Sequence, residues 1–213
     1  MRLRFSTSSF FTGVVLALYA CNSRNFSETA QCEAVTSYIA WEISELVDEK
    51  LVFATRNTNL NIGHASEAEI EEFVMMDWFD LRGKSPWSQD IPYKTIKKTL
   101  AEKQSLRSFL GNPEMVDAVT SCQNLRSLLQ KKSIMTGQRA VEQVISLKNK
   151  KTGQYPRAIH AQYMPILSGD GQSAMVFASQ SYGELAGGGL IIKIERQATG
   201  EWKPTRAHVL WVS

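Results

Sequence analysis

The hydrophobic pattern of this chain changes from a helical repeat to a strand-like repeat near residue 140. Before that point, apolar residues recur every three or four positions, as on one face of a helix. From about Val141, short apolar runs are separated by turn signals rich in Gly, Asn and Asp. This order predicts an α+β fold in which N-terminal helices pack on a C-terminal antiparallel β-meander. The sheet is expected to bury one face on the helices and to leave the other partly wet.

The domain organisation follows from the same pattern. The helical part is expected at about 30–131 and the sheet part at about 141–213, and neither has an obvious complete core alone. We therefore expect a single α+β domain over 30–213. A composition of 43% hydrophobic and 21% charged residues is typical of globular proteins and excludes collagen-like, disordered and polytopic membrane chains. Helices followed by a meander also allow a cone-like sheet similar to that of the nuclear-transport-factor-2-like superfamily, which includes both enzymes and binding modules.

Periodicity and capping signals place the individual elements. Ser66 followed by Glu69 is a capping box, so a helix should begin at Glu67. Asn112 and Pro113 suit the start of another helix. The predicted helices span about 28–51, 67–81, 92–110 and 113–131. The predicted strands span about 144–147, 158–167, 173–181, 190–197, 202–203 and 207–212, with a flexible loop at 183–189.

The N-terminus resembles an export signal. Arg2 and Arg4 precede the eleven uncharged residues from Phe10 to Ala20, a run too short to cross a bilayer. A basic start followed by a short apolar run is typical of a secretory signal peptide, predicted here at 1–20, with a polar tether at 21–29. The alternative is a buried N-terminal helix.

The end of this run resembles the lipobox of bacterial lipoproteins, with Leu18, Tyr19 and Ala20 before Cys21. The resemblance implies that Cys21 becomes the first mature residue and carries a lipid such as palmitate, which attaches the protein to a membrane. Asn22 favours the outer membrane, with the domain facing the periplasm. Cleavage after Ala20 by ordinary signal peptidase is the alternative, and it would give a periplasmic or secreted protein.

Two cysteines remain, Cys32 and Cys122, both on apolar helical faces. An exported compartment permits a disulfide between them. The bridge would close a loop of about 90 residues and contribute roughly 4 kcal/mol to stability. Two separate buried thiols are the alternative.

Charge gives little reason to expect nucleic-acid binding. Arg2 and Arg4 lie in the leader, so its removal lowers the formal net charge from +3 to +1. Within the mature chain, residues 21–92 are acidic and the region 93–157 is basic, with 13 basic and 4 acidic residues. These parts could attract each other, or the basic region could bind an envelope protein, a glycan or lipid headgroups.

The sequence offers few catalytic residues. No metal-ligand spacing or cofactor motif is present, so neither a metal nor a cofactor is expected. His160 and His208 lie in predicted strands of one sheet and could meet as an acid–base pair. Asp170 lies in a Gly-Asp-Gly sequence that predicts a tight turn.

These observations predict an exported cell-envelope protein, a lipoprotein with a non-catalytic binding or scaffolding role. One alternative is a periplasmic hydrolase that uses His160 and His208. It requires both rings in one concave pocket, so rings on opposite faces of the sheet would exclude it. The other is a partner-binding module that uses the basic region 93–157.

Overall fold

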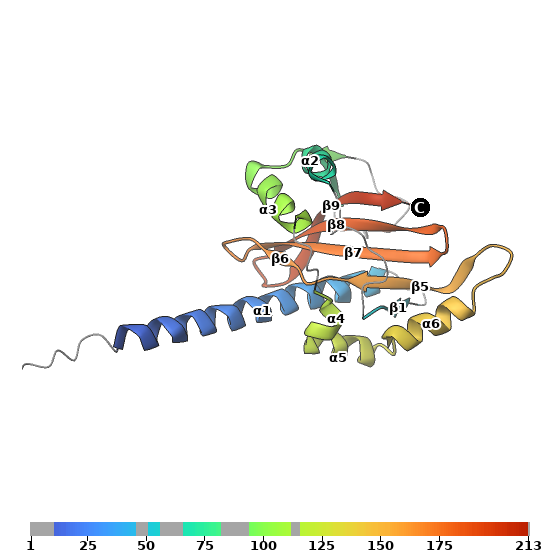
Figure 1. The fold of residues 1–213 in the computed structure, drawn as a ribbon, viewed down its shortest axis with the longest axis horizontal. Helices are drawn as coiled ribbons and strands as arrows, with labels where there is room; N and C mark the ends of the chain where they lie inside the picture. The colour runs from blue at the N-terminus through green and yellow to red at the C-terminus, as the bar shows by residue number, and fades with distance from the viewer. Residues whose placement is uncertain (1–10, 46–50, 56–65, 82–93, 112–115, 213) are drawn as a thin grey trace, which may run out of the picture.

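The computed structural model describes residues 11–45, 51–55, 66–81, 94–111 and 116–212, and these form a mixed sheet covered by helices (Figure 1). The order of elements confirms the α+β class, with helices concentrated in the N-terminal part and long strands in the C-terminal part. The helices are α1 (Phe11–Glu45), α2 (Glu67–Met75), α3 (Leu100–Leu110), α4 (Ala118–Ser121), α5 (Gln123–Lys131) and α6 (Gln138–Ser146). The strands are β1 (Leu51–Phe53), β2 (Trp78–Asp80), β3 (Thr95–Ile96), β4 (Met135–Thr136), β5 (Gln154–Gln162), β6 (Ile166–Leu167), β7 (Ser173–Gly183), β8 (Ala186–Arg196) and β9 (Trp202–Val212).

The sheet is built around the predicted antiparallel meander. Its strand order is β3-β2-β9-β8-β7-β5-β1-β4, and β6 pairs with β7. Strands β5, β7, β8 and β9 are antiparallel neighbours, whereas β1 lies parallel to both β4 and β5. Strands β1 to β4 were not predicted, because strands of two or three residues are too short to show an alternating pattern.

Helices cover both faces of the sheet, so the expectation of one partly wet face is wrong. Alternate residues of β7 belong to different cores: Val176 packs with α1, α4 and α5, whereas Phe177 packs with α2, α3 and α6. We call these two sides the α1 face and the α3 face. The middle of each central strand is a buried apolar run, Ala174–Ala178 in β7 and Leu190–Ile192 in β8, a pattern typical of strands buried on both sides.

The predicted capping box at the start of α2 is present. The Ser66 N–H donates to Glu69 Oε2 at 2.6 Å, and the Glu69 N–H donates to Ser66 Oγ at 3.3 Å. The helix ends at Met75 and not near Leu81, because residues 78–80 pair with β9 as strand β2.

The next predicted helix, 92–110, begins later than expected. Residues 92 and 93 lie outside the described part of the chain, residues 95 and 96 form β3, and α3 begins at Leu100. A second capping box sets this start. The Thr99 N–H donates to Glu102 Oε2 at 2.7 Å, and the Glu102 N–H donates to Thr99 Oγ1 at 3.2 Å.

Three further boundaries differ from the prediction. The predicted helix 113–131 is divided into α4 and α5 by the extended backbone of Cys122, and the expected cap at Asn112 and Pro113 lies outside the described residues. The predicted strand 144–147 is the end of α6, in which Val141 and Val144 form a buried helical stripe. The predicted loop 183–189 is a tight hairpin, and its last three glycines lie in β8.

Helix α1 is continuous from Phe11 to Glu45 and projects from the domain at its N-terminal end (Figure 1). It starts before the predicted position, and it includes Cys21 and the segment 21–29 predicted as a tether. It ends earlier than predicted, because residues 51–53 form β1. Among the described residues, no helix combines the length and apolar character needed to cross a membrane.

Candidate functional site

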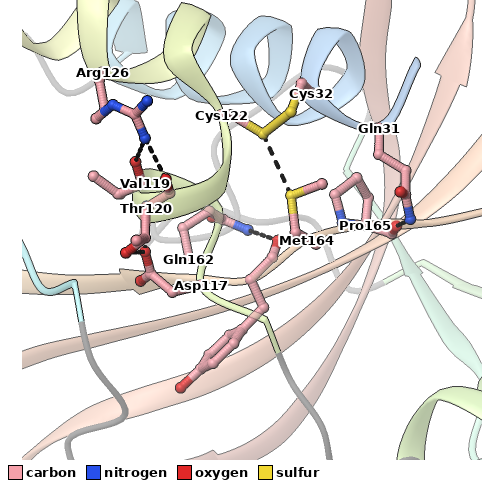
Figure 2. Close-up of a disulfide and its surroundings, with 11 residues drawn as sticks. Gln31, Cys32, Asp117, Val119, Thr120, Cys122, Arg126, Gln162, Met164 and Pro165 are labelled. Atoms are coloured by element: carbon pink, nitrogen blue, oxygen red, sulfur yellow. Dashed lines mark hydrogen bonds between the residues drawn. A yellow bond between two sulfur atoms is a disulfide. The ribbon is translucent and has the colours of Figure 1, made fainter. Parts of the chain in front are cut away.

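The structure joins Cys32 and Cys122 in a disulfide (Figure 2). The sulfur atoms are 2.11 Å apart and the Cα atoms 5.3 Å apart, and the two residues are 90 positions apart in the sequence. Cys32 lies on α1, and Cys122 lies at the junction of α4 and α5 with no exposed surface. The bridge therefore fixes the long N-terminal helix to the short helices beside it.

Hydrogen bonds around the bridge join α1 to the segment between β5 and β6, and join α5 to α4 (Figure 2). Gln31 Nε2 donates to the Pro165 carbonyl at 2.7 Å, and Met164 Sδ lies 3.3 Å from Cys122 Sγ. Arg126 Nη1 donates to the Val119 carbonyl at 3.1 Å and also to that of Thr120. These contacts give the bridge a structural role.

His160 lies on the α1 face of the sheet. It alternates on β5 with Ile159 and Ala161, which both belong to the core of the α3 face. Its ring centre is 5.2 Å from that of Phe53 on β1. Only 2% of the residue is exposed, and this burial lowers its pKa to about 3.

His208 lies on the opposite face. It pairs in register with Ile191 of the α3-face core, and its ring centre is 6.1 Å from that of Phe73. Burial, together with the charge of Lys98, lowers its pKa to about 4. Strands β7 and β8 also separate the strands of the two histidines, a distance of about 14 Å.

The alternative in which His160 and His208 meet as an acid–base pair is therefore excluded. Alternation of side chains along β5 and β9 sends the two rings to different sides of the sheet. They share no pocket, and burial keeps both rings neutral at physiological pH.

The acidic and basic helices meet at α2 and α3. Arg107 of α3 pairs with Glu67 of α2 at 3.3 Å and also contacts Glu71. Lys98 Nζ donates to the carbonyls of Phe73, at 3.2 Å, and Met76. At this contact, the opposite charges of α2 and α3 attract each other, as one of the two alternatives for the charge distribution expects. Partner binding by the rest of the basic region 93–157 stays a prediction.

A cavity of about 300 Å³ lies on the α3 face, between the start of α3, the β6–β7 turn and strands β7 to β9. Glu102, Lys193 and Arg206 contribute charge to one side of it. Glu102 Oε1 accepts from Lys193 Nζ at 2.6 Å and from Arg206 Nη1 at 3.0 Å. The same carboxylate completes the capping box of α3, so one side chain fixes this helix to both β8 and β9.

The ion pairs in this cavity shift the pKa values of Glu102 and Lys193 in opposite directions. Burial opposes ionisation of Glu102, but hydrogen bonds from Lys193 and the Thr99 N–H, with the nearby positive charges, lower its pKa below the ordinary value. Burial opposes protonation of Lys193 as well, but its bonds to Glu102 and Glu195 raise its pKa. The Lys193–Glu195 distance is 2.9 Å. Glu102 and Lys193 are therefore both charged at neutral pH.

Asp170 lines another part of the same cavity, in the turn predicted from the sequence. Its Oδ1 accepts from Ser168 Oγ at 2.5 Å and from the Gln172 N–H at 3.0 Å, and the Ser168 bond is the largest cause of its lowered pKa. Gly171 follows with a φ of +66°, a conformation that favours glycine. The turn therefore holds an ionised carboxylate at the cavity.

This cavity was not predicted from the sequence. Two signals were present: Glu102 three positions after Thr99, and the single cation Lys193 within the apolar run of β8. Neither signal showed that Glu102 would meet residues 91 and 104 positions later in the chain.

Among the described residues, no group of three or more His, Cys, Asp or Glu side chains is placed to hold a metal ion. Comparisons with protein-family models, curated proteins and solved structures gave no match for this chain.

Proposed function

We propose that this protein is an exported cell-envelope lipoprotein whose domain has a non-catalytic binding role. The observation that carries the proposal is the Cys32–Cys122 bridge, because structural disulfides persist in oxidising compartments outside the cytosol. The resemblance of the N-terminus to a lipoprotein signal independently supports export, with Cys21 as the lipid-bearing residue.

The geometry of α1 supports attachment at Cys21. This residue precedes Cys32 by eleven positions on one continuous helix, a distance of about 16 Å. A lipid at Cys21 would place the domain close to the membrane surface, on a helical spacer fixed to the fold by the bridge. Without the lipid, the same chain would be periplasmic or secreted.

The binding role is supported by the charged cavity between α3 and the sheet. It has a cavity volume at the lower end of the range of ligand pockets and contains several charged groups. Neither histidine lines it, so it lacks the acid–base pair that the hydrolase alternative required.

The test is the intact mass of the protein purified from its native membranes, with and without reductant. We expect loss of residues 1–20, a gain the size of a lipid, and an increase of two hydrogen atoms on reduction. Cys21→Ser should abolish the lipid gain, whereas the matched control Cys32→Ala should retain it. An unprocessed N-terminus would contradict export, and a processed chain without the gain would contradict lipidation.

A further inference from the structure

The cavity beside α3 is lined by charged groups from separate elements. Arg206 on β9 and Lys193 on β8 are cations, and we call them the positive region. Asp170, in the turn between β6 and β7, is an anion, and we call it the negative region. Ile166, Leu167 and Met175 add an apolar lining.

The positive region retains hydrogen-bonding capacity. A guanidinium group has five N–H donors, and Arg206 uses Nη1 for Glu102. Within the described part of the chain, its other two nitrogens have no hydrogen-bond partner. Because its side chain is 25% exposed, this edge is accessible to a carboxylate, with which arginine forms bidentate bonds.

The negative region is an exposed, ionised carboxylate. Asp170 Oδ1 accepts from Ser168 Oγ and from the Gln172 N–H, and the Asp170 N–H also bonds to its own carboxylate. These bonds fix the orientation of the carboxylate at the cavity. An exposed, ionised carboxylate suits an ammonium group.

The charge balance disfavours a ligand of single charge. Lys193 and Arg206 are opposed by Glu102, Glu195 and Asp170, so a simple anion meets no net positive charge. A simple cation would leave the free edge of Arg206 unpaired. A molecule that carries both charges satisfies both regions.

We propose that this cavity binds a small zwitterion of the amino-acid or short-peptide class, with its carboxylate on Arg206 and its ammonium group on Asp170. This inference rests on the binding role proposed above. The cavity of about 300 Å³ limits the ligand to a small molecule.

The test is calorimetric titration of the full chain with alanine, β-alanine and the dipeptide Ala-Ala. N-acetylalanine lacks the ammonium group and alaninamide lacks the carboxylate, so both should bind at least about tenfold more weakly than the best zwitterion. Glucose serves as an uncharged polar probe.

Three variants locate the site. Asp170→Asn changes an exposed turn and should weaken the best zwitterion about tenfold with little effect on folding. Arg206→Lys keeps the charge but removes the planar edge, and it should also weaken binding. Lys203→Gln is the matched control, since Lys203 is an exposed cation on the same strand outside the cavity, and it should leave affinity unchanged.

Binding of a zwitterion that is lost on blocking either charge, and weakened by Asp170→Asn but not by Lys203→Gln, supports the proposal. The proposal is overturned if no zwitterion binds at about 10 mM, if blocked forms or glucose bind as tightly, or if Asp170→Asn has no effect. The mass experiment tests export and lipidation separately, so failure of either proposal is recognised without reference to the other.

Discussion

Removing the Cys32–Cys122 bridge should destabilise the protein by an amount set mainly by the length of the loop it closes. The cysteines are 90 positions apart, and the chain-entropy model assigns a loop of this length about 4.6 kcal/mol at 25 °C. Reduction releases this constraint on the unfolded chain. Because domains are stable by only about 5–15 kcal/mol in total, the effect should be large.

The double variant Cys32→Ala/Cys122→Ala should be slightly less stable than the reduced protein. It removes the cross-link and also the buried sulfur of Cys122, which contacts Met164 Sδ at 3.3 Å. The resulting cavity should add about 1 kcal/mol. The total of about 5–6 kcal/mol corresponds to a fall in Tm of roughly 10–24 °C for a domain of this size.

Urea unfolding of the oxidised, reduced and double-variant proteins measures these differences. All three should carry Cys21→Ala, so that neither a lipid nor a third thiol affects the comparison. The m-value should rise when the bridge is absent, because the unfolded chain becomes more expanded. A difference below about 1 kcal/mol between protein shown by mass to be oxidised and protein shown to be reduced would refute the loop-entropy reasoning.

Three titratable side chains give predictions for the dependence of stability on pH, each measured by urea titration across pH. The pKa of Glu102 is lowered in the folded state, so the stability that its carboxylate contributes should be lost as pH falls below about 4. Glu102→Gln should lower the free energy of unfolding by about 3 kcal/mol at pH 7 and should make it depend less on acid pH. Burial lowers the pKa of Lys98 to about 8, so the unfolded chain binds more protons between pH 8 and 10.5 and stability should rise over that interval. Lys98→Met should flatten the rise, and an unchanged slope would argue against a buried ammonium group. The pKa of His208 is lowered to about 4, so stability should fall as pH drops from 6.5 towards 4; His208→Gln should reduce this fall, and an identical profile would contradict its burial as a neutral ring.

Local signals in the sequence predicted several elements correctly. The helix start at Glu67 depends on Ser66 and Glu69, three positions apart, so the whole capping box can be read from one short segment. The long strands β7 and β8 were predicted over most of their length, whereas β9 was predicted as two short strands, 202–203 and 207–212. The pairing of Cys32 with Cys122 was one of two open alternatives, which the structure distinguishes by bringing their Cα atoms within 5.3 Å.

Other errors arose where neighbouring strands override local preference. Residues 78–80 lie within a helical pattern that was predicted to run to Leu81, yet they form strand β2, which pairs with β9 because the edge of that strand offers backbone partners. Conversely, Val144 has a β-branched side chain that favours a strand, but it packs as part of the buried stripe of α6.

The sequence by itself determined the fold class, the change from helices to a C-terminal meander, and the capping box at Ser66, since each depends on residues that are near in the chain. Tertiary structure alone decided which side of the sheet each histidine faces and which charges meet beside α3. A shift of one residue in register sends a side chain to the other face, so His160 and His208 could not be placed from composition or spacing. Glu102, Lys193 and Arg206 meet only because α3 packs across β8 and β9, a contact between segments about 100 positions apart.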